Sequence, residues 1–283
     1  MPRKTRRATK TSKSDWVIAI PSYKRAVTLR DSTLKTLKEY RIPPAKIHVF
    51  VANKEEEALY KATLEPGSYG HMHVAIPGMA AVRNFITGFF PLGKPIFSID
   101  DDIHGFMEYS PTARRNEMPL RSLSATIDKG FQEARRTGFR LFGFYPVANG
   151  YFMKDAPPTT DLRYVMGGAW GILNPGPQLD IILDDKEDFL RSVMMYLLDG
   201  GVIRFGNISP RTQAYKTSGG MQEERTMKRI EASAKKMVEL FPGLVKINLT
   251  KKSGMPEVRL RDSRGESERT FGPKVLAEFM KRA

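Results

Sequence analysis

The residues with the clearest chemical potential are three consecutive carboxylates, Asp100, Asp101 and Asp102, which follow the apolar run 95–99. Such a short β-branched and aromatic run predicts a buried strand. Unpaired charges do not follow a strand into a core, so we expect the acids at its carboxyl end, where open α/β sheets bind ligands. Alternation would point Asp100 and Asp102 to one side, as ligands for Mg²⁺ or Mn²⁺ that also binds substrate phosphates. The alternative is a solvated acidic loop.

A second acidic cluster precedes an apolar helical pattern at 189–197 and consists of Asp184, Asp185, Glu187 and Asp188. We expect these acids at the helix N-cap and first turn, where the helix dipole stabilises negative charge. Capping alone explains one or two of them, and four acids in five positions exceed what capping requires. A carboxylate fixed at a helix start beside a cleft can act as a general base on an incoming hydroxyl.

Polar and basic residues end the first predicted strand, 17–25, at Ser22, Tyr23, Lys24 and Arg25. An aromatic ring can stack on a base and the cations can contact phosphates, which favours nucleotide recognition. The glycine pattern of a dinucleotide-binding loop is missing from this turn. An ordinary surface turn is the alternative.

Further cations and glycines could reach the same ligand. Arg83 lies in an otherwise apolar helix, where it could extend to solvent or into the crevice. The segment 215–226 lacks P-loop spacing, but Lys216 and the amides of Gly219 and Gly220 could close over a diphosphate.

The order of elements predicts the architecture that positions these residues. Strand-like and helical segments alternate from residue 17 to residue 99, which favours a mostly parallel sheet covered by helices on both faces. Residues 103–119 read as a polar segment. The pattern after it predicts further helices at 122–138 and 222–240 and strands at 139–147 and 201–210. The apolar run 162–173 contains Gly167-Gly168, which indicates either a close approach of the backbone to another group or a bend or bulge. A hairpin around Ser253-Gly254 and a final short helix follow.

Composition narrows the class of protein. The 283 residues are 41% hydrophobic, contain no cysteine, and show no membrane-length apolar run or signal peptide. Disulfides, thiol catalysis and cysteine-bound zinc are excluded, and we expect an intracellular protein. The net charge is +15, of which six basic groups lie in 1–14 and a net +5 in 244–283. We therefore expect a basic disordered tail (1–14), a main domain (15–243), a basic extension (244–283) and a polyanionic partner.

Taken in order, these landmarks resemble the GT-A class of nucleotide-sugar glycosyltransferases. The matching stretches are IPSYKR at 20–25, VRN at 82–84, DDD as a D-x-D motif, GGAWG at 167–171 and the acidic cluster DDKEDF at 184–189. The resemblance covers about 15–226. With its small size and basic charge, the chain is most similar to the phage TET-associated glycosyltransferases, which add sugars to 5-hydroxymethylcytosine in DNA and are related to the kinetoplastid base J glucosyltransferase.

The resemblance implies a role for each matching residue. Asp100 and Asp102 would bind the divalent metal (Mn²⁺ or Mg²⁺) and the donor diphosphate, with Asp101 as a competitor. Ser22, Tyr23 and Arg25 would bind the nucleotide, and Arg83 the donor. Asp185 best matches the catalytic base, with Asp188, Asp184 and Glu187 as competitors. One departure is that many GT-A enzymes use a late histidine as a metal ligand, whereas the last histidine here is His104.

The resemblance further implies a UDP-sugar donor, most simply UDP-glucose, double-stranded DNA with a hydroxylated base as acceptor, and the cytoplasm of a phage-infected bacterium, without a membrane partner. Three alternatives stay open. The acceptor could be a polysaccharide, lipid or protein; the chain could be an inactive nucleic-acid-binding module on a transferase fold; or paired carboxylates could serve nucleotidyl transfer.

Overall fold

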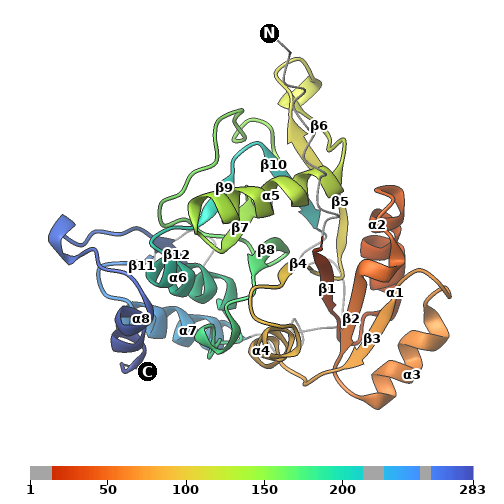
Figure 1. The fold of residues 1–283 in the computed structure, drawn as a ribbon, viewed down its shortest axis with the longest axis horizontal. Coiled ribbons are helices and arrows are strands. Elements are labelled where there is room, and N and C mark those ends of the chain that lie inside the picture. Colours follow the sequence, from red (N-terminus) through yellow and green to blue (C-terminus); the bar gives the residue numbers. More distant parts are fainter. Residues whose placement is uncertain (1–14, 213–225, 249–255, 283) are drawn as a thin grey trace, which may run out of the picture.

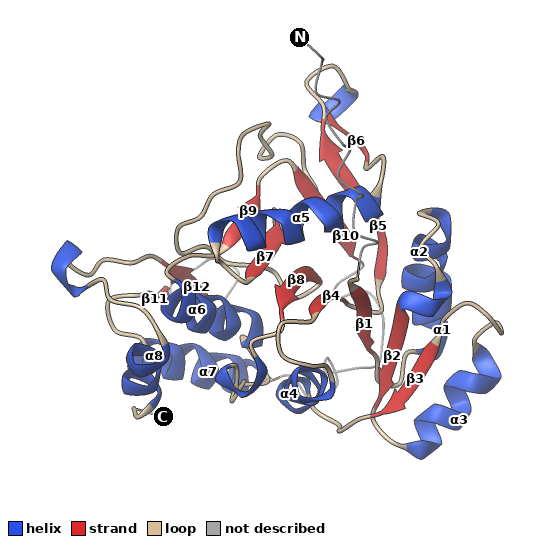
Figure 2. Cartoon of the chain, in the orientation of Figure 1, coloured by secondary structure: helices blue, strands red, loops and turns tan. Residues whose placement is uncertain are grey.

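The computed structural model describes residues 15–212, 226–248 and 256–282, and it has an α/β fold (Figures 1 and 2). A seven-stranded sheet has the order β3-β2-β1-β4-β8-β7-β9, in which β8 runs antiparallel to both neighbours and the other pairs are parallel. This confirms the expected mostly parallel mixed sheet flanked by helices. The strands are β1 (Val17–Pro21), β2 (Ile47–Val51), β3 (His71–Val74), β4 (Pro95–Ile99), β7 (Leu141–Phe144), β8 (Ala169–Leu173) and β9 (Ile203–Phe205).

Helices pack on both faces of this sheet because its central strands bury side chains on both sides. On β1, Ile18 and Ile20 join one apolar cluster and Ala19 joins the other, as strand alternation requires. The helices are α1 (Ala26–Leu29), which continues through a π-helical turn (Arg30–Leu34) into α2 (Lys35–Glu39), then α3 (Lys54–Thr63), α4 (Met79–Phe89), α5 (Leu123–Thr137), α6 (Glu187–Asp199), α7 (Met227–Leu240) and α8 (Pro273–Met280).

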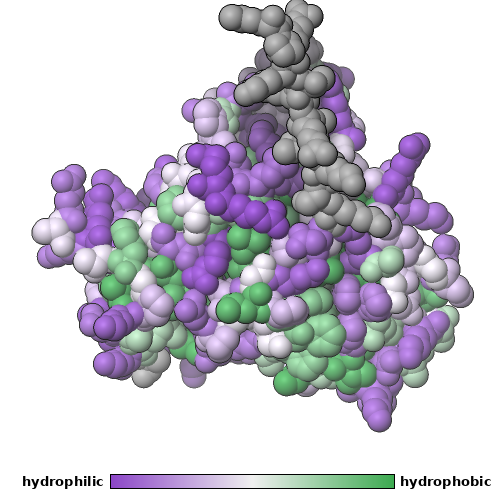
Figure 3. All heavy atoms as spheres, in the orientation of Figure 1, coloured by the Kyte–Doolittle hydropathy of each residue, from purple (hydrophilic) through white to green (hydrophobic). Residues whose placement is uncertain are grey.

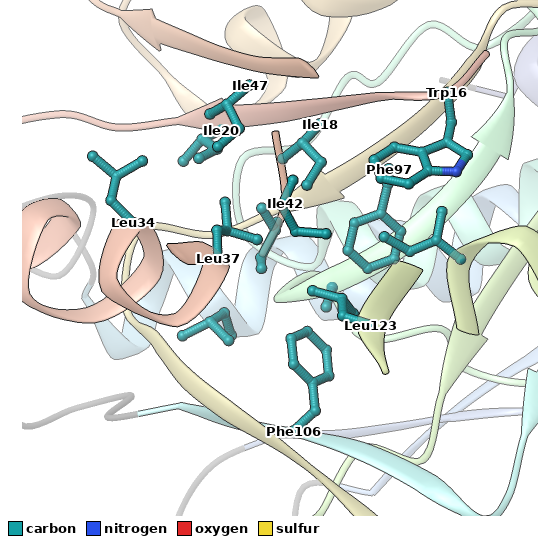
Figure 4. Close-up of a cluster of buried hydrophobic side chains, with 14 of the residues drawn as sticks. Trp16, Ile18, Ile20, Leu34, Leu37, Ile42, Ile47, Phe97, Phe106 and Leu123 are labelled. Atoms are coloured by element: carbon teal, nitrogen blue, oxygen red, sulfur yellow. The ribbon is translucent and has the colours of Figure 1, made fainter. Parts of the chain in front are cut away.

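The first cluster fixes the strand whose end carries the acids. In Figure 4, Phe97 of β4 lies beside Ile18 of β1 and faces Leu123 of α5, while Leu37 of α2 covers the strands from the side. Trp16 closes the start of β1, and its indole N–H donates to Asp128 at 2.7 Å. Burial on this scale holds the carboxyl ends of β1 and β4 rigidly side by side.

A second, three-stranded sheet was not predicted. It has the order β10-β5-β6, with β5 (Ile103–Tyr109), β6 (Glu117–Pro119) and β10 (Ile208–Thr212). The expectation of a polar segment at 103–119 was therefore wrong. The prediction of a single strand at 201–210 was also wrong. The segment is interrupted at Gly206-Asn207, and its two parts, β9 and β10, belong to different sheets.

The C-terminal hairpin and helix are confirmed. β11 (Val245–Asn248) pairs antiparallel with β12 (Glu257–Leu260), and α8 follows. Val245, Val258 and Leu276 are buried in the same apolar cluster as α6 and α7, so the extension shares a core with the rest of the chain. The side-chain hydroxyl of Tyr196 on α6 donates to Asp262 at 2.8 Å and fastens the extension further.

The surface seen in Figure 3 is mostly hydrophilic, with apolar patches in its lower part. Phe89 at the end of α4 and Leu92 after it are exposed apolar side chains. Among the residues that the structure describes, no helix combines the length and the hydrophobicity needed to cross a membrane.

Candidate functional site: an acidic crevice at the ends of β1, β2 and β4

The crevice lies at the point of the sheet where the strand order changes direction: the strands that follow β1 in the chain lie first on one side of it and then on the other. β1 has β2 on one side and β4 on the other, and open α/β sheets bind ligands outside the carboxyl ends of such strands. Three segments form its walls: the turn after β1, the segment from 76 into the first turn of α4, and the acids after β4. The lining residues are Pro21, Ser22, Tyr23, Arg25, Phe50, Ala52, Ile76, Pro77, Gly78, Met79, Val82, Asp100, Asp101 and Asp102. One wall is thus apolar and the other acidic.

The three acids leave β4 in a turn, so strand alternation does not order them. Ser22 Oγ donates to Asp101 Oδ2 at 2.6 Å, and Arg25 Nη1 lies 3.4 Å from Asp101 Oδ1 and 3.9 Å from Asp102 Oδ2. Asp101 and Asp102 therefore share Arg25, whereas Asp100 points to a different cation. Strand alternation cannot be the reason that Asp100 and Asp102 lie together, because β4 ends at Ile99, but both residues line the same crevice.

Burial changes the protonation of these acids. Desolvation raises the pKa of Asp101 to about 7, against the opposing effects of the Ser22 hydrogen bond and the Arg25 charge. Desolvation also raises the pKa of Asp102, which Arg25 again opposes. Asp101 and Asp102 are only 6% and 8% exposed, so they lie buried in the crevice wall rather than solvated on a loop.

Tyr60 of α3, which sequence patterns gave no reason to select, supports this turn. Because Ser22 gives its proton to Asp101, the Tyr60 hydroxyl donates to Ser22 Oγ at 2.7 Å and accepts from the backbone N–H of Arg25 at 3.0 Å. Tyr60 is fully buried, and burial raises the pKa of its hydroxyl, so it remains a donor. The hydrogen bonds that link Tyr60, Ser22 and Asp101 hold the turn after β1 in position.

Arg83 reaches the acids rather than solvent. Its side chain is 4% exposed, and its two Nη atoms donate to Ser98 Oγ and to Asp100 Oδ1, each at 2.8 Å. Nη2 also lies 3.6 Å from Glu187 Oε1. Arg83 therefore connects the acids after β4 with the start of α6.

Behind Arg83 lies a buried ion cluster that was not predicted. Glu187 accepts from Arg191 at 2.7 Å, and the Arg191 guanidinium lies 3.8 Å from the ring centroid of Trp170. The i, i+4 spacing of Glu187 and Arg191 was a visible signal of this pair. The cluster makes Glu187 a structural partner of two arginines.

The second acidic cluster begins before the helix. The N-cap of α6 is Lys186, with a φ of 68°, so Asp184 and Asp185 precede the helix and only Glu187 and Asp188 occupy its first turn. The expected placement of all four acids at the N-cap and first turn is corrected accordingly. Asp184 instead accepts from the backbone N–H of Ala80 at 2.9 Å, at the rim of the crevice.

Asp185 and Asp188 differ in how accessible their carboxylates are. Asp185 is 1% exposed, and Arg229 Nε of α7 lies 3.2 Å from its Oδ2. Asp188 is only partly buried and accepts from the Tyr164 hydroxyl at 2.6 Å and from the Gly167 N–H at 3.3 Å. Desolvation raises the pKa of Tyr164 well above its ordinary value, so Tyr164 stays a donor. This geometry favours Asp188 as a base.

Gly167 and Gly168 bring the two acidic clusters together. Arg83 Nη2 lies 3.4 Å from the Gly167 carbonyl, and the N–H of Asp100 donates to the Gly168 carbonyl at 2.9 Å. A Cβ at Gly167 would lie 3.0 Å from Glu187 Oε1. The close backbone approach expected at this glycine pair is therefore present, and it is against α6.

A divalent cation fits this site only together with a ligand. Among residues 15–212, 226–248 and 256–282, no three His, Cys, Asp or Glu side chains form a complete metal cage. Carboxylate oxygens at the crevice nevertheless suit Mg²⁺, which typically takes one or two of them and completes its shell with phosphates and water. The predicted donor contacts at Lys216, Gly219 and Gly220 lie outside the described residues.

No protein-family model matches this chain, and no curated protein sequence matches it significantly.

Proposed function

We propose that the chain is a GT-A-type glycosyltransferase that moves a sugar, most simply glucose, from a UDP-sugar to the hydroxymethyl group of 5-hydroxymethylcytosine in DNA. The observation that carries the proposal is the crevice itself. At one switch point it combines an aromatic and apolar wall, Arg25 and three carboxylates, and Arg83 joins those carboxylates to the acids of α6. These features suit a nucleotide diphosphate that is bound together with a divalent cation.

The donor's base would lie against the apolar wall, near Tyr23 and Phe50, with Ser22 and Arg25 at the crest of β1. Asp102 and Asp100 would hold Mg²⁺ or Mn²⁺ together with the diphosphate, and the cation would neutralise the charge of the leaving UDP. Arg83 fixes Asp100 in place, since its guanidinium is itself held by Ser98.

Asp188 would take the proton from the acceptor hydroxyl as that oxygen forms a bond to the anomeric carbon and the bond to UDP breaks. Tyr164 and the Gly167 amide hold the carboxylate in position. A positioned general base contributes about 10²–10⁴-fold in rate. A single displacement of this kind inverts the anomeric centre.

Charge supports a DNA acceptor. The chain carries +15, and the excess is concentrated at its two ends, which suits a sequence-independent grip on phosphates. A hydroxymethyl group in a duplex becomes accessible to such a crevice when its nucleotide is flipped out of the stack.

Release of UDP from a panel of UDP-sugars tests the proposal, with Mg²⁺ or Mn²⁺ and with hydroxymethylcytosine duplex, unmodified duplex or no acceptor. We expect release that requires the modified duplex and is lost in Asp102→Asn. Release that ignores DNA but responds to a polysaccharide, lipid or protein would reject the acceptor. Absence of release with every donor would reject the transferase, and release of pyrophosphate from nucleotides would indicate nucleotidyl transfer.

A further inference from the structure

We infer that a surface far from the crevice, formed by residues 110–116 and 147–154 and called here the distal tip, binds the DNA duplex that flanks the acceptor nucleotide. This inference rests on the proposed function, because it takes DNA as the acceptor.

The distal tip is one packed unit made from two distant segments. The backbone of Gly150 lies so close to the hairpin turn that a Cβ there would clash with the carbonyl oxygen of Arg115. The Gly150 N–H also donates to Glu117 Oε2 at 3.0 Å. The two segments therefore form one continuous surface.

The distal tip exposes aromatic rings. Tyr151 is 79% exposed and Phe152 is 51% exposed, and their rings form a T-shaped pair with centroids 5.0 Å apart. Val147 beside them is also exposed. Exposed rings on a well-packed loop can insert between base steps of a duplex from the minor groove, as the apolar wedges of minor-groove-binding proteins do.

The same tip exposes unpaired cations. Arg114, Arg115 and Lys154 are exposed, and none forms an ion pair or side-chain hydrogen bond with another residue in the described part of the chain. Glu117, the nearest acid on the hairpin, already accepts from Gly150. Asp155 is exposed next to Lys154, so the electrostatic argument rests on the adjacent arginines at the turn. Arginines next to aromatic rings favour a nucleic acid over a neutral polysaccharide or an apolar protein surface.

The distance from the crevice suits a duplex. β5 starts directly after Asp102 and leads to the turn at 110–116, which lies at the top of Figure 1. Its seven residues span about 24 Å at roughly 3.4 Å each. At about 3.4 Å per base pair, this corresponds to roughly seven base pairs beyond the acceptor. A nucleotide in the crevice would leave the flanking duplex within reach of the tip.

The test is fluorescence anisotropy of hydroxymethylcytosine duplexes over a range of salt, with the wild type, Tyr151→Ala/Phe152→Ala and Arg114→Ala/Arg115→Ala. Lys38→Ala/Lys61→Ala removes two exposed cations from α2 and α3, away from the tip, and is the matched control. Circular dichroism and UDP affinity confirm that each variant is folded.

On a duplex with more than ten base pairs on both sides of the acceptor, we expect the aromatic variant to bind at least five-fold more weakly, because it loses the apolar groups that would insert between base steps. For the arginine variant, the slope of the logarithm of the binding constant against the logarithm of the salt concentration should be smaller in magnitude by about 1.8. The control variant should change the affinity less than two-fold. With only three flanking base pairs, all four proteins should bind alike.

If the wild type binds and glycosylates DNA while both tip variants match the control, the inference alone fails. If the wild type does not bind DNA, the proposed function fails with it. Weakened binding to a protein or polysaccharide but not to DNA would also overturn it.

Discussion

At the scale of residues, Arg83 is the side chain on which the site most depends. It is buried and contacts Ser98, Asp100 and Glu187. Removing one member of a buried ion pair typically costs about 3–5 kcal/mol. Because Glu187 keeps Arg191, we expect Arg83→Leu to lower the free energy of unfolding by about 3 kcal/mol, measured by urea denaturation. Arg30→Ala, which removes an exposed pair with Asp31, should change the free energy of unfolding far less, and equal losses in the two variants would refute this role.

The choice of base is also a matter of single residues. We expect Asp188→Asn to reduce sugar transfer by about 10²–10⁴-fold with UDP affinity nearly unchanged, since it removes the proton acceptor and keeps the shape. Asp185→Asn should retain most transfer, because Asp185 is buried against Arg229. Single-turnover rates on hydroxymethylcytosine duplex measure both. A large loss in Asp185→Asn with Asp188→Asn active would reverse the assignment.

The sequence predicts that the side chains at the ends of neighbouring strands lie close together in the site. It does not predict the residues that support those side chains from deeper in the protein. The crevice lining includes Ser22, Tyr23, Arg25 and Asp100 because the parallel strands that carry them end at one edge of the sheet. Tyr60 and Tyr164 went unnoticed because a tyrosine in a helix or loop has no distinguishing pattern. Their roles depend on tertiary contacts, which no local spacing encodes.

At the scale of elements, the packing of β2 against β3 makes stability depend on pH through His48 of β2. His48 Nδ1 lies 3.0 Å from His73 Nε2, and the His48 ring stacks on His71. Desolvation, followed by the charges of His71, His73 and Lys94, lowers the pKa of His48 to about 4. Its unfolded pKa is about 6.5, so the unfolded chain binds the proton more tightly.

The contribution of His48 to stability is therefore complete above about pH 6.5 and is lost as the pH falls towards 4. We expect the urea midpoint of the wild type to fall more between pH 7.5 and 5 than that of His48→Gln, which cannot titrate. Parallel pH profiles for the two proteins would show that His48 contributes nothing to this dependence.

Elements defined by local patterns were predictable, and those defined by long-range pairing were not. β2 (Ile47–Val51) lies within the stretch 17–99 for which alternating strands and helices were predicted, because a short apolar run between turns is typical of a strand. β5 was missed because His104, Gly105 and Glu108 interrupt its apolar pattern, and it exists through pairing with β10, about a hundred residues later in the sequence.

At the scale of the whole molecule, the distribution of charge leads to a prediction about the first fourteen residues. They carry six basic groups and no acidic group, so their deletion should remove phosphate contacts. We expect the shortened chain to bind duplex DNA more weakly, with a smaller salt slope, while UDP release without DNA stays unchanged. Equal affinities at low salt, measured by anisotropy, would show that this segment does not contact DNA.

The class of fold followed from the sequence because strands and helices alternate regularly, and regular alternation leaves few arrangements other than a parallel sheet between helices. The number of sheets could not be predicted from the sequence. A second sheet arises where β5 leaves the acids and turns away from β4, and only the assembled chain shows where the partners of such a strand lie.

The most direct measurement is the mass of a hydroxymethylcytosine duplex after incubation with the chain, UDP-glucose and Mn²⁺. The proposed function predicts a gain of one hexose residue per modified cytosine in the wild type, a much slower gain with Asp188→Asn, and no gain on unmodified duplex. An unchanged mass with every UDP-sugar tried, from a folded protein that binds the duplex, would contradict it.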